Sequence, residues 1–335
     1  MAKDMMPHFE LYQPSDVEEA LGLLERFGER SWKLAGGYDS LNWLKDRAKR
    51  TEAVIDLEGL EALKGIREWG EGIEIGAMTT LTEVERSPLV RERFGLLADA
   101  ARQVASPQIR NAGTLGGNLC QDTRCWYYRS GLPCYRAGGN VCYAGTPEGM
   151  NREHCIFGAD RCVAVTPSDT APALVALDAE MVVRRPGGER VIPAGDFFMD
   201  PGTDITRMTV LGPHDLLTAV RIPGRWAGAR FHFEKVADRG SWDFALVSVS
   251  AAMRVSDGVI RESRIVAGAV QCVPRRLRAV EPLLGGSAPE EEFAEEAGAL
   301  AVRGAEPLNY NHFKIPLLEN LVKRAVRSAA RPAEA

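Results

Sequence analysis

The chain has 335 residues, of which 45% are hydrophobic and 26% charged, and a formal net charge of −5. This length exceeds the needs of one small core and predicts two or three domains. The negative charge argues against nucleic-acid binding, which requires a basic face. No run of about 18 apolar residues is present, so we expect no membrane span. The segment Met1–His8 lacks an apolar signal core, so we expect a cytoplasmic protein.

Helices and strands alternate along the first part of the chain. Ser15 and Glu18 have the spacing of a capping box and predict a helix that ends at Gly28. Apolar patterning then predicts strands at 32–35, 53–57 and 71–77 and helices at 43–45, 81–86 and 96–104.

The second part of the chain reads as a hairpin followed by another αβ unit. A helix at 173–177 precedes a hairpin, 180–185 with 189–192, around Pro186-Gly187-Gly188. The Pro- and Gly-containing stretch 223–228 predicts an interdomain link. Strands follow at 231–236, 244–255 and 259–270, and helices at 276–284, 290–303 and 312–327. We expect the tail after Ser328 to fray.

Two glycine-rich turns are candidates for holding phosphate. The first, Gly36-Gly37, follows the strand at 32–35, and the second lies within Arg110–Leu119. Glycine allows a close backbone approach, so we expect Gly116 and Gly117 at a pyrophosphate. The spacing differs from the Rossmann fingerprint, which indicates a dinucleotide held by another fold. An ordinary strand–helix turn remains the alternative for the first turn.

Six of the seven cysteines fall between positions 120 and 162: Cys120, Cys125, Cys134, Cys142, Cys155 and Cys162. In a reducing compartment such clustering indicates metal or redox chemistry. The absence of a C-x-x-C pair argues against a ribbon-type zinc site. Arg124, Arg129 and Arg136 would offset the negative charge of a thiolate-bound cluster. The alternative is that the cysteines are small buried hydrophobic side chains.

Three motifs resemble those that bind FAD in the medium, flavin-carrying subunit of molybdenum hydroxylases, the family of xanthine dehydrogenase and carbon monoxide dehydrogenase. They are Lys33–Gly37, Arg110–Asn118 and Pro167–Asp169. Phe233–Val236 and Asp243–Val249 resemble the start of the family's C-terminal domain. The resemblance covers nearly the whole chain, in order.

The resemblance implies an α+β fold. A two-subdomain FAD-binding domain of the p-cresol methylhydroxylase type is expected over 1–224, followed by a smaller α/β C-terminal domain over 225–330. Tyr38 stands where the family usually has threonine, so we expect its side chain to point away from the phosphates. The residues implied to bind FAD are Lys33, Leu34, Ala35, Gly36, Gly37, Tyr38, Asp39, Ser40, Arg110, Asn111, Gly113, Thr114, Gly116, Gly117, Asn118, Ser168, Asp169 and Lys235.

The stretch from about 120 to 162 resembles an insertion found in some members only. These are similar to the 4-hydroxybenzoyl-CoA reductase β subunit and the flavin subunit of bacterial aromatic aldehyde oxidoreductases, in which an inserted loop binds a [4Fe–4S] cluster. The implied ligands are Cys125, Cys134, Cys142 and Cys162, with Cys155 open as an alternative to Cys162. Cys272 lies far along the sequence and is expected to be inert.

The function implied is that of an electron-transfer subunit with no catalytic residue of its own. Its partners would be a molybdopterin-binding large subunit and a [2Fe–2S] small subunit, and its FAD would exchange electrons with an external donor or acceptor. Two alternatives stay open. One is a self-contained FAD-dependent oxidase or reductase of the same fold, and the other is a structural zinc-binding protein.

Overall fold

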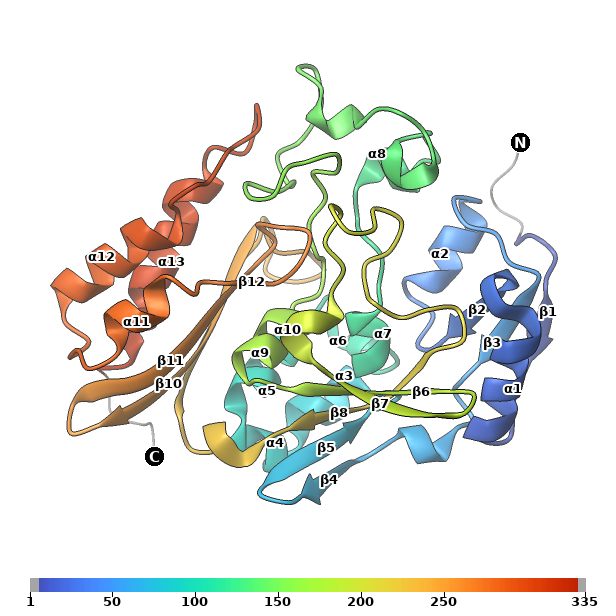
Figure 1. The fold of residues 1–335 in the computed structure, drawn as a ribbon, viewed down its shortest axis with the longest axis horizontal. Coiled ribbons are helices and arrows are strands. Elements are labelled where there is room, and N and C mark those ends of the chain that lie inside the picture. Colours follow the sequence, from blue (N-terminus) through green and yellow to red (C-terminus); the bar gives the residue numbers. More distant parts are fainter. Residues whose placement is uncertain (1–5, 331–335) are drawn as a thin grey trace.

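The structure is a computed structural model that describes residues 6–330. Figure 1 shows three sheets with helices packed on them, so the fold is α+β. The first sheet has the order β1-β3-β2, from β1 (Glu10–Tyr12), β2 (Ser31–Leu34) and β3 (Ala53–Asp56), and both strand pairs are parallel. Helix α2 (Ser40–Lys45) comes shortly after β2, so the first glycine turn lies between them.

Helix α1 (Val17–Phe27) covers the first sheet with an apolar face. Its cap is Asp16, whose carboxylate accepts from the Glu19 amide at 2.9 Å, while the Glu19 carboxylate accepts from the Ser15 amide at 2.7 Å. The predicted box of Ser15 and Glu18 is therefore wrong by one residue. Both pairs have the same spacing, and the charged Asp16 oxygen is the better partner for a helix N-terminus.

The second sheet has five strands in the order β4-β5-β8-β6-β7, and all neighbours are antiparallel. The strands are β4 (Ile66–Trp69), β5 (Gly72–Gly76), β6 (Glu180–Arg185), β7 (Gly188–Pro193) and β8 (Leu216–Ile222). Their apolar side chains share one core with α3 (Leu81–Arg86), α4 (Pro88–Arg93), α5 (Gly95–Arg102) and α9 (Thr170–Ala176). The sequence did not predict β8, although it joins β5 to β6.

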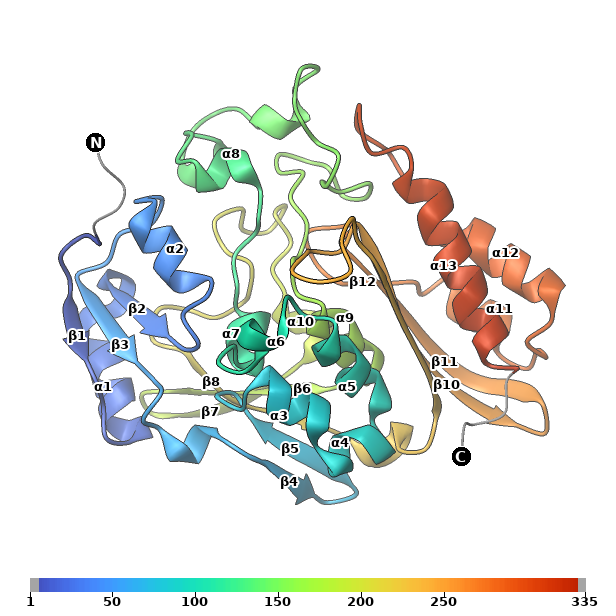
Figure 2. The ribbon, with the colours of Figure 1, turned by 180° about the vertical axis from the view of Figure 1, so that it is seen from behind.

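The third sheet has the order β12-β11-β10-β9, from β9 (Arg230–Val236), β10 (Val247–Ser256), β11 (Val259–Gly268) and β12 (Arg275–Arg276). Helices α11 (Val280–Leu284), α12 (Glu291–Ala301) and α13 (Lys314–Ser328) lie together on one face of it (Figures 1 and 2). Helices α5 and α9 contact the same sheet. Residue 276, predicted to start a helix, belongs to β12 instead, and α11 begins four residues later. The tail beyond Ala330 and residues 1–5 lie outside the described residues.

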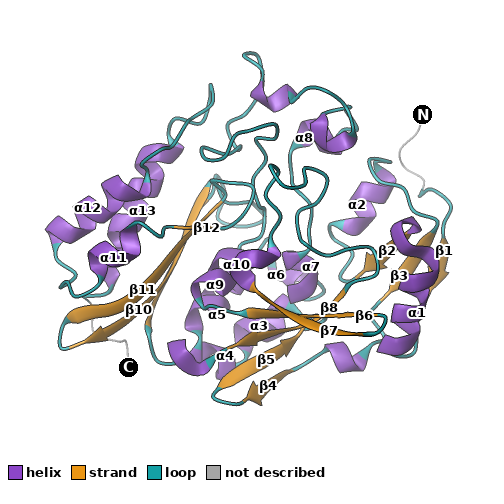
Figure 3. Ribbon diagram, viewed as in Figure 1, coloured by secondary structure: helices purple, strands orange, loops and turns teal. Residues whose placement is uncertain are grey.

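The cysteine-rich stretch is mostly loop, with the short helix α8 (Trp126–Arg129) as its longest regular element (Figure 3). It is fixed to the third sheet by backbone bonds: the amides of Ile156 and Phe157 both donate to the Val270 carbonyl. The shorter helices α6 (Pro107–Arg110), α7 (Leu115–Leu119) and α10 (Ala194–Phe197) complete the fold. Among residues 6–330, no helix is long and apolar enough to cross a membrane.

Candidate functional site

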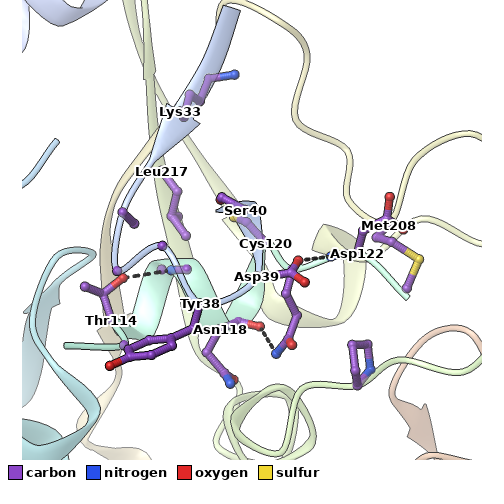
Figure 4. A pocket seen from close by; sticks show the side chains of 18 of the residues that line it. Lys33, Tyr38, Asp39, Ser40, Thr114, Asn118, Cys120, Asp122, Met208 and Leu217 are labelled. Carbon is purple, nitrogen blue, oxygen red and sulfur yellow. Dashed lines mark hydrogen bonds between the residues drawn. The ribbon is translucent and has the colours of Figure 1, made fainter. Parts of the chain in front are cut away.

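A cavity of about 510 Å³ lies between the two glycine turns and is shown close up in Figure 4. This volume is typical of a pocket for a small molecule or cofactor. Thirteen of the eighteen residues predicted to bind a dinucleotide line it: Lys33, Ala35, Gly36, Gly37, Tyr38, Asp39, Ser40, Gly113, Thr114, Gly116, Gly117, Asn118 and Asp169. Tyr38, whose side chain we expect to point away from the phosphates, is among them.

The first turn lines the cavity with residues 36 to 40. The amides of residues 36 to 40 donate to no acceptor within residues 6–330. Consecutive free amides in a turn form a concave site for an anion. Gly36 is required here because a Cβ on it would lie 2.3 Å from the Ala112 carbonyl oxygen of the second turn. The two turns are therefore packed against each other.

The second turn uses its amides differently. Thr114 caps α7 by accepting from the Gly117 amide at 3.1 Å, and the Gly116 amide donates to the Ala77 carbonyl at 2.8 Å. A Cβ on Gly116 would lie 2.8 Å from that same carbonyl oxygen, so this glycine serves packing. A Cβ on Gly117 would approach only Thr114 Oγ1, at 3.0 Å, and Ala35 Cβ, at 3.5 Å. Both neighbours line the cavity, so of these two glycines Gly117 is the one that keeps space open for a ligand.

Asn118 is held rigidly at the cavity wall. Its Oδ1 accepts from the hydroxyls of Ser168 and Thr170, both at 2.6 Å. Because Oδ1 already accepts two hydrogen bonds, the side-chain NH2 group is what Asn118 has left to offer a ligand. Ser168, predicted to touch the cofactor, therefore acts one layer behind the cavity wall.

Four other predicted contacts, Leu34, Arg110, Asn111 and Lys235, also lie outside the cavity lining. Arg110 is buried and donates to Glu85 and to the Val104 carbonyl, both at 3.0 Å. The Lys235 ammonium donates to Asp169, the Gln103 carbonyl and the Asp243 carbonyl. The Arg110 and Lys235 side chains thus hold the walls of the cavity in place.

The structure adds two lining segments that the sequence did not predict as a site. One is the loop before β8 together with the start of that strand, and the other follows β9. Neither has a glycine motif that would have revealed it. Trp242 has a left-handed backbone, with φ of 52°, and a side chain that is largely exposed. The guanidinium of Arg124 lies 4.6 Å from the ring centre of Phe244. The added lining residues are Thr206, Arg207, Met208, Thr209, Leu211, Gly212, Leu216, Leu217, Trp242 and Phe244.

Asp39 joins this cavity to the cysteine-rich stretch. One of its oxygens lies 3.2 Å from Arg124 and 3.1 Å from Arg129, and the other accepts from the Asp122 amide at 3.1 Å, a bond drawn in Figure 4. The side chains of Asp39 and Arg129 are largely buried, so solvent screens this pair less than a surface pair. The first turn and the cysteine-rich stretch are thus coupled electrostatically.

A second, smaller cavity is lined by all four predicted ligands, Cys125, Cys134, Cys142 and Cys162. Cys155 is outside it, buried against Ala144 and Val163, and Cys120 lines the first cavity. Cys272, which lies far along the sequence and is expected to be inert, packs against Cys162 and Met208. The turn between β11 and β12 brings it to the loop.

Burial disfavours the thiolate form of two cysteines of the second cavity. Burial raises the pKa of Cys125 to about 11 and also raises the pKa of Cys142. Within residues 6–330, no three His, Cys, Asp or Glu side chains are placed to hold a metal ion. A metal would have to draw the thiols together and displace their protons.

The second cavity has a buried positive charge beside the cysteines, that of Arg136. The Arg136 side chain is 1% exposed, and its Nε and Nη1 have no hydrogen-bond partner. A buried guanidinium with orphaned donors is costly unless negative charge lies near it. Four thiolates bound to iron would supply that charge. The four thiols are the donor type that an iron–sulfur cluster takes, and the buried cation suits its negative charge, but in residues 6–330 these side chains are not placed as a metal site.

Comparison with known proteins covers nearly the whole chain. The family described as "FAD binding domain in molybdopterin dehydrogenase" matches residues 7–225. The family described as "CO dehydrogenase flavoprotein C-terminal domain" matches residues 232–329. The carbon monoxide dehydrogenase medium chain of Hydrogenophaga pseudoflava is 30% identical, over 96% of this chain and 97% of that one. The aldehyde oxidoreductase FAD-binding subunit PaoB of Escherichia coli is 34% identical, over 88% and 90%.

Solved structures agree with these sequence comparisons. A carbon monoxide dehydrogenase structure from Hydrogenophaga pseudoflava superposes with a TM-score of 0.77 at 30% identity, covering 97% of this chain and 98% of the other. A Cu,Mo-CO dehydrogenase structure gives the same TM-score at 25% identity, covering 97% and 99%. The similarity includes the C-terminal sheet and its helices, because nearly all of both chains is aligned.

Proposed function

We propose a function from the premise that this chain belongs to the family of FAD-binding medium subunits of molybdenum hydroxylases. Its members are flavin subunits of dehydrogenases and oxidoreductases. The resemblance and the α+β fold class predicted from the sequence are thereby confirmed. The proposal assigns the residues that hold the cofactors and the role of the chain in electron transfer.

The free amides of the first turn carry the proposal for FAD. We place the pyrophosphate against the amides of residues 36 to 40, because these amides have no acceptor within the described residues and their residues line the larger cavity. Asn118 adds a side-chain donor. Trp242 and Phe244 line the same cavity and offer apolar contacts for the isoalloxazine ring. When bound, FAD supplies both one-electron and two-electron transfer.

A [4Fe–4S] cluster bound by Cys125, Cys134, Cys142 and Cys162 is the second part of the proposal. Two observations support it: the four thiols share one cavity, and the buried Arg136 beside them has orphaned donors. Iron would displace the thiol protons, and the positive Arg136 side chain would favour the resulting negative charge.

The proposed role is electron relay. The chain would pass electrons between a [2Fe–2S] small subunit, a molybdopterin-binding large subunit and an external donor or acceptor. The relatives' description as medium chains supports such an assembly. The chain's own residues orient the flavin, order the cysteine-rich stretch and keep the two sites linked through Asp39. We further propose that the domains meet near residues 224–225 and that the complex works in the cytoplasm, where thiols stay reduced.

Anaerobic purification of the natively expressed complex tests this function. Flavin, iron and zinc are quantified, an absorption spectrum is recorded, and copurifying chains are identified. FAD with about four irons per chain, in complex with a large and a small subunit, is the expected result. FAD without iron in an active lone chain would favour the self-contained flavoenzyme. One zinc per chain without flavin would favour the structural zinc protein.

A further inference from the structure

Arg136 is a deeply buried cation beside the cysteine cavity. It lies in a short 3-10 turn, Tyr135–Ala137, two residues after Cys134. Its Nη2 donates to the Cys272 sulfur at 3.5 Å. Its other two nitrogens have no hydrogen-bond partner within the described residues.

The positive charge of Arg136 is only partly neutralised among residues 6–330. The carboxylate that lies within 4 Å of it is that of Asp122. Asp122 Oδ1 lies 3.8 Å from Arg136 Nη1, beyond hydrogen-bond distance. The same carboxylate pairs with Lys49 at 3.2 Å and accepts from the Tyr128 hydroxyl at 3.4 Å. Two cations therefore share one anion, and positive charge remains at the cavity.

We propose that Arg136 sets the reduction potential of the cluster. This inference rests on the proposed function. Reduction adds one negative charge to the cluster, and a buried cation stabilises the more negative state through a poorly screened interaction. Arg136 thus raises the potential relative to the same site without that charge. It acts on the cluster as a tuning residue and needs to bind neither substrate nor iron.

Arg161 provides a matched control. It lines the same cavity and precedes the proposed ligand Cys162, yet it is exposed. Solvent and salt screen an exposed charge strongly, so its loss changes the potential little. The comparison separates burial of the charge from mere proximity to the cysteines.

The experiment is a redox titration of the assembled complex, followed by electron paramagnetic resonance of the reduced cluster, with iron counted in each variant. Arg136→Gln should lower the ratio of reduced to oxidised cluster at least tenfold at a fixed potential, about 59 mV for one electron. Arg136→Lys should restore most of this shift, and Arg161→Gln should shift the potential less than Arg136→Gln. Equal shifts in Arg136→Gln and Arg161→Gln would overturn the inference.

If Arg136→Gln assembles no cluster, a second variant still tests whether Arg136 tunes the reduction potential. Asp122→Asn removes the shared counter-charge and should move the potential in the opposite direction, upward. An unchanged or lower potential in Asp122→Asn would overturn the tuning role while leaving the cluster intact. Wild-type complex without iron would instead overturn the cluster assignment, and the role of Arg136 with it.

Discussion

The Lys235 ammonium donates to the Asp169 carboxylate at 2.6 Å, although the two side chains are only 5% and 6% exposed. Lys235 lies on β9, and Asp169 immediately precedes α9. Burial raises the pKa of Asp169, and the Lys235 charge opposes that rise. The pair joins the third sheet to the wall of the flavin cavity.

Removing the lysine should destabilise the protein strongly. Lys235→Met leaves the Asp169 carboxylate buried without its partner, a change that costs about 3–5 kcal/mol when one member of a buried pair is lost. Unfolding in denaturant measures the loss. The double variant Lys235→Met/Asp169→Leu should recover part of it, because the uncompensated charge is gone. A double variant no more stable than the single one would contradict this explanation.

Gly117 and Gly116 should respond differently to the same substitution. Gly117→Val should fold but purify largely without flavin, because its side chain enters space beside Thr114 and Ala35 at the cavity wall. Gly116→Val should instead lower the thermal stability of the protein, because a Cβ there collides with the Ala77 backbone. Flavin absorbance and melting temperature separate the two effects. Full FAD occupancy in Gly117→Val would refute the placement of the cofactor.

The four cysteines of the second cavity should be individually required for iron. Cys125→Ser, Cys134→Ser, Cys142→Ser and Cys162→Ser should each lose about one cluster's iron and disorder the loop from Arg124 to Asp160, because the ligands order it together. Cys155→Ser and Cys120→Ser are the controls and should keep their iron. Iron lost from Cys155→Ser but retained in Cys162→Ser would show that the ligand set is wrong.

Asp39 should couple flavin binding to the order of the cysteine-rich stretch. Asp39→Asn keeps the side chain's shape but removes the charge that holds Arg124 and Arg129. We expect weaker FAD retention and faster proteolysis near α8, by roughly tenfold if about 1.4 kcal/mol is lost. Asp160→Asn, at an exposed position of the same stretch, serves as a control of equal charge change. An unchanged rate of proteolysis in Asp39→Asn would contradict the proposed coupling between flavin binding and the order of the cysteine-rich stretch.

Lys314 should make the stability depend on pH. It is fully buried, with its ammonium bound to the Ala269 and Glu153 carbonyls, and burial lowers its pKa from 10.5 to about 7. Between these values the unfolded chain binds more protons than the folded one, so this group makes the protein more stable as pH rises from 7 to 10.5. The stability of wild type relative to Lys314→Met should increase over that range, by at most about 1.4 kcal/mol per pH unit. A flat difference between wild type and Lys314→Met over this pH range would contradict the lowered pKa of Lys314.

Local sequence was sufficient where one short segment specifies its own contacts. Helix α3 spans Leu81–Arg86 as predicted, because Thr80 and Glu83 form a capping box that needs nothing else. The hairpin of β6 and β7 follows from its Pro-Gly-Gly turn. Before α1, Ser15 and Glu18 have the same spacing as Asp16 and Glu19. The pattern therefore predicted the helix but not which residue caps it.

The glycine motifs are similarly local, which is why both turns could be predicted as cofactor contacts from the chain alone. The different structural roles of the individual glycines could not be predicted from the sequence. Gly36 and Gly116 are required by the carbonyls of Ala112 and Ala77, and neither contact follows from a motif. The residues 206–217 that complete the cavity have no signature, because they become neighbours of the turns only when β8 pairs with β5.

The sequence by itself determined the family, and it singled out four cysteines that share one cavity, because glycine turns and cysteine spacing are properties of continuous segments. Only the tertiary structure decided which of the nearby arginines lies buried beside the four cysteines. Arg124, Arg129 and Arg136 are equivalent candidates along the chain. Two of them pair with Asp39, whereas Arg136 is 1% exposed and its nearest carboxylate, that of Asp122, lies 3.8 Å away. The physical reason is that burial and the distance to a counter-charge depend on all the segments packed around a side chain, including Cys272 from the turn beside the third sheet.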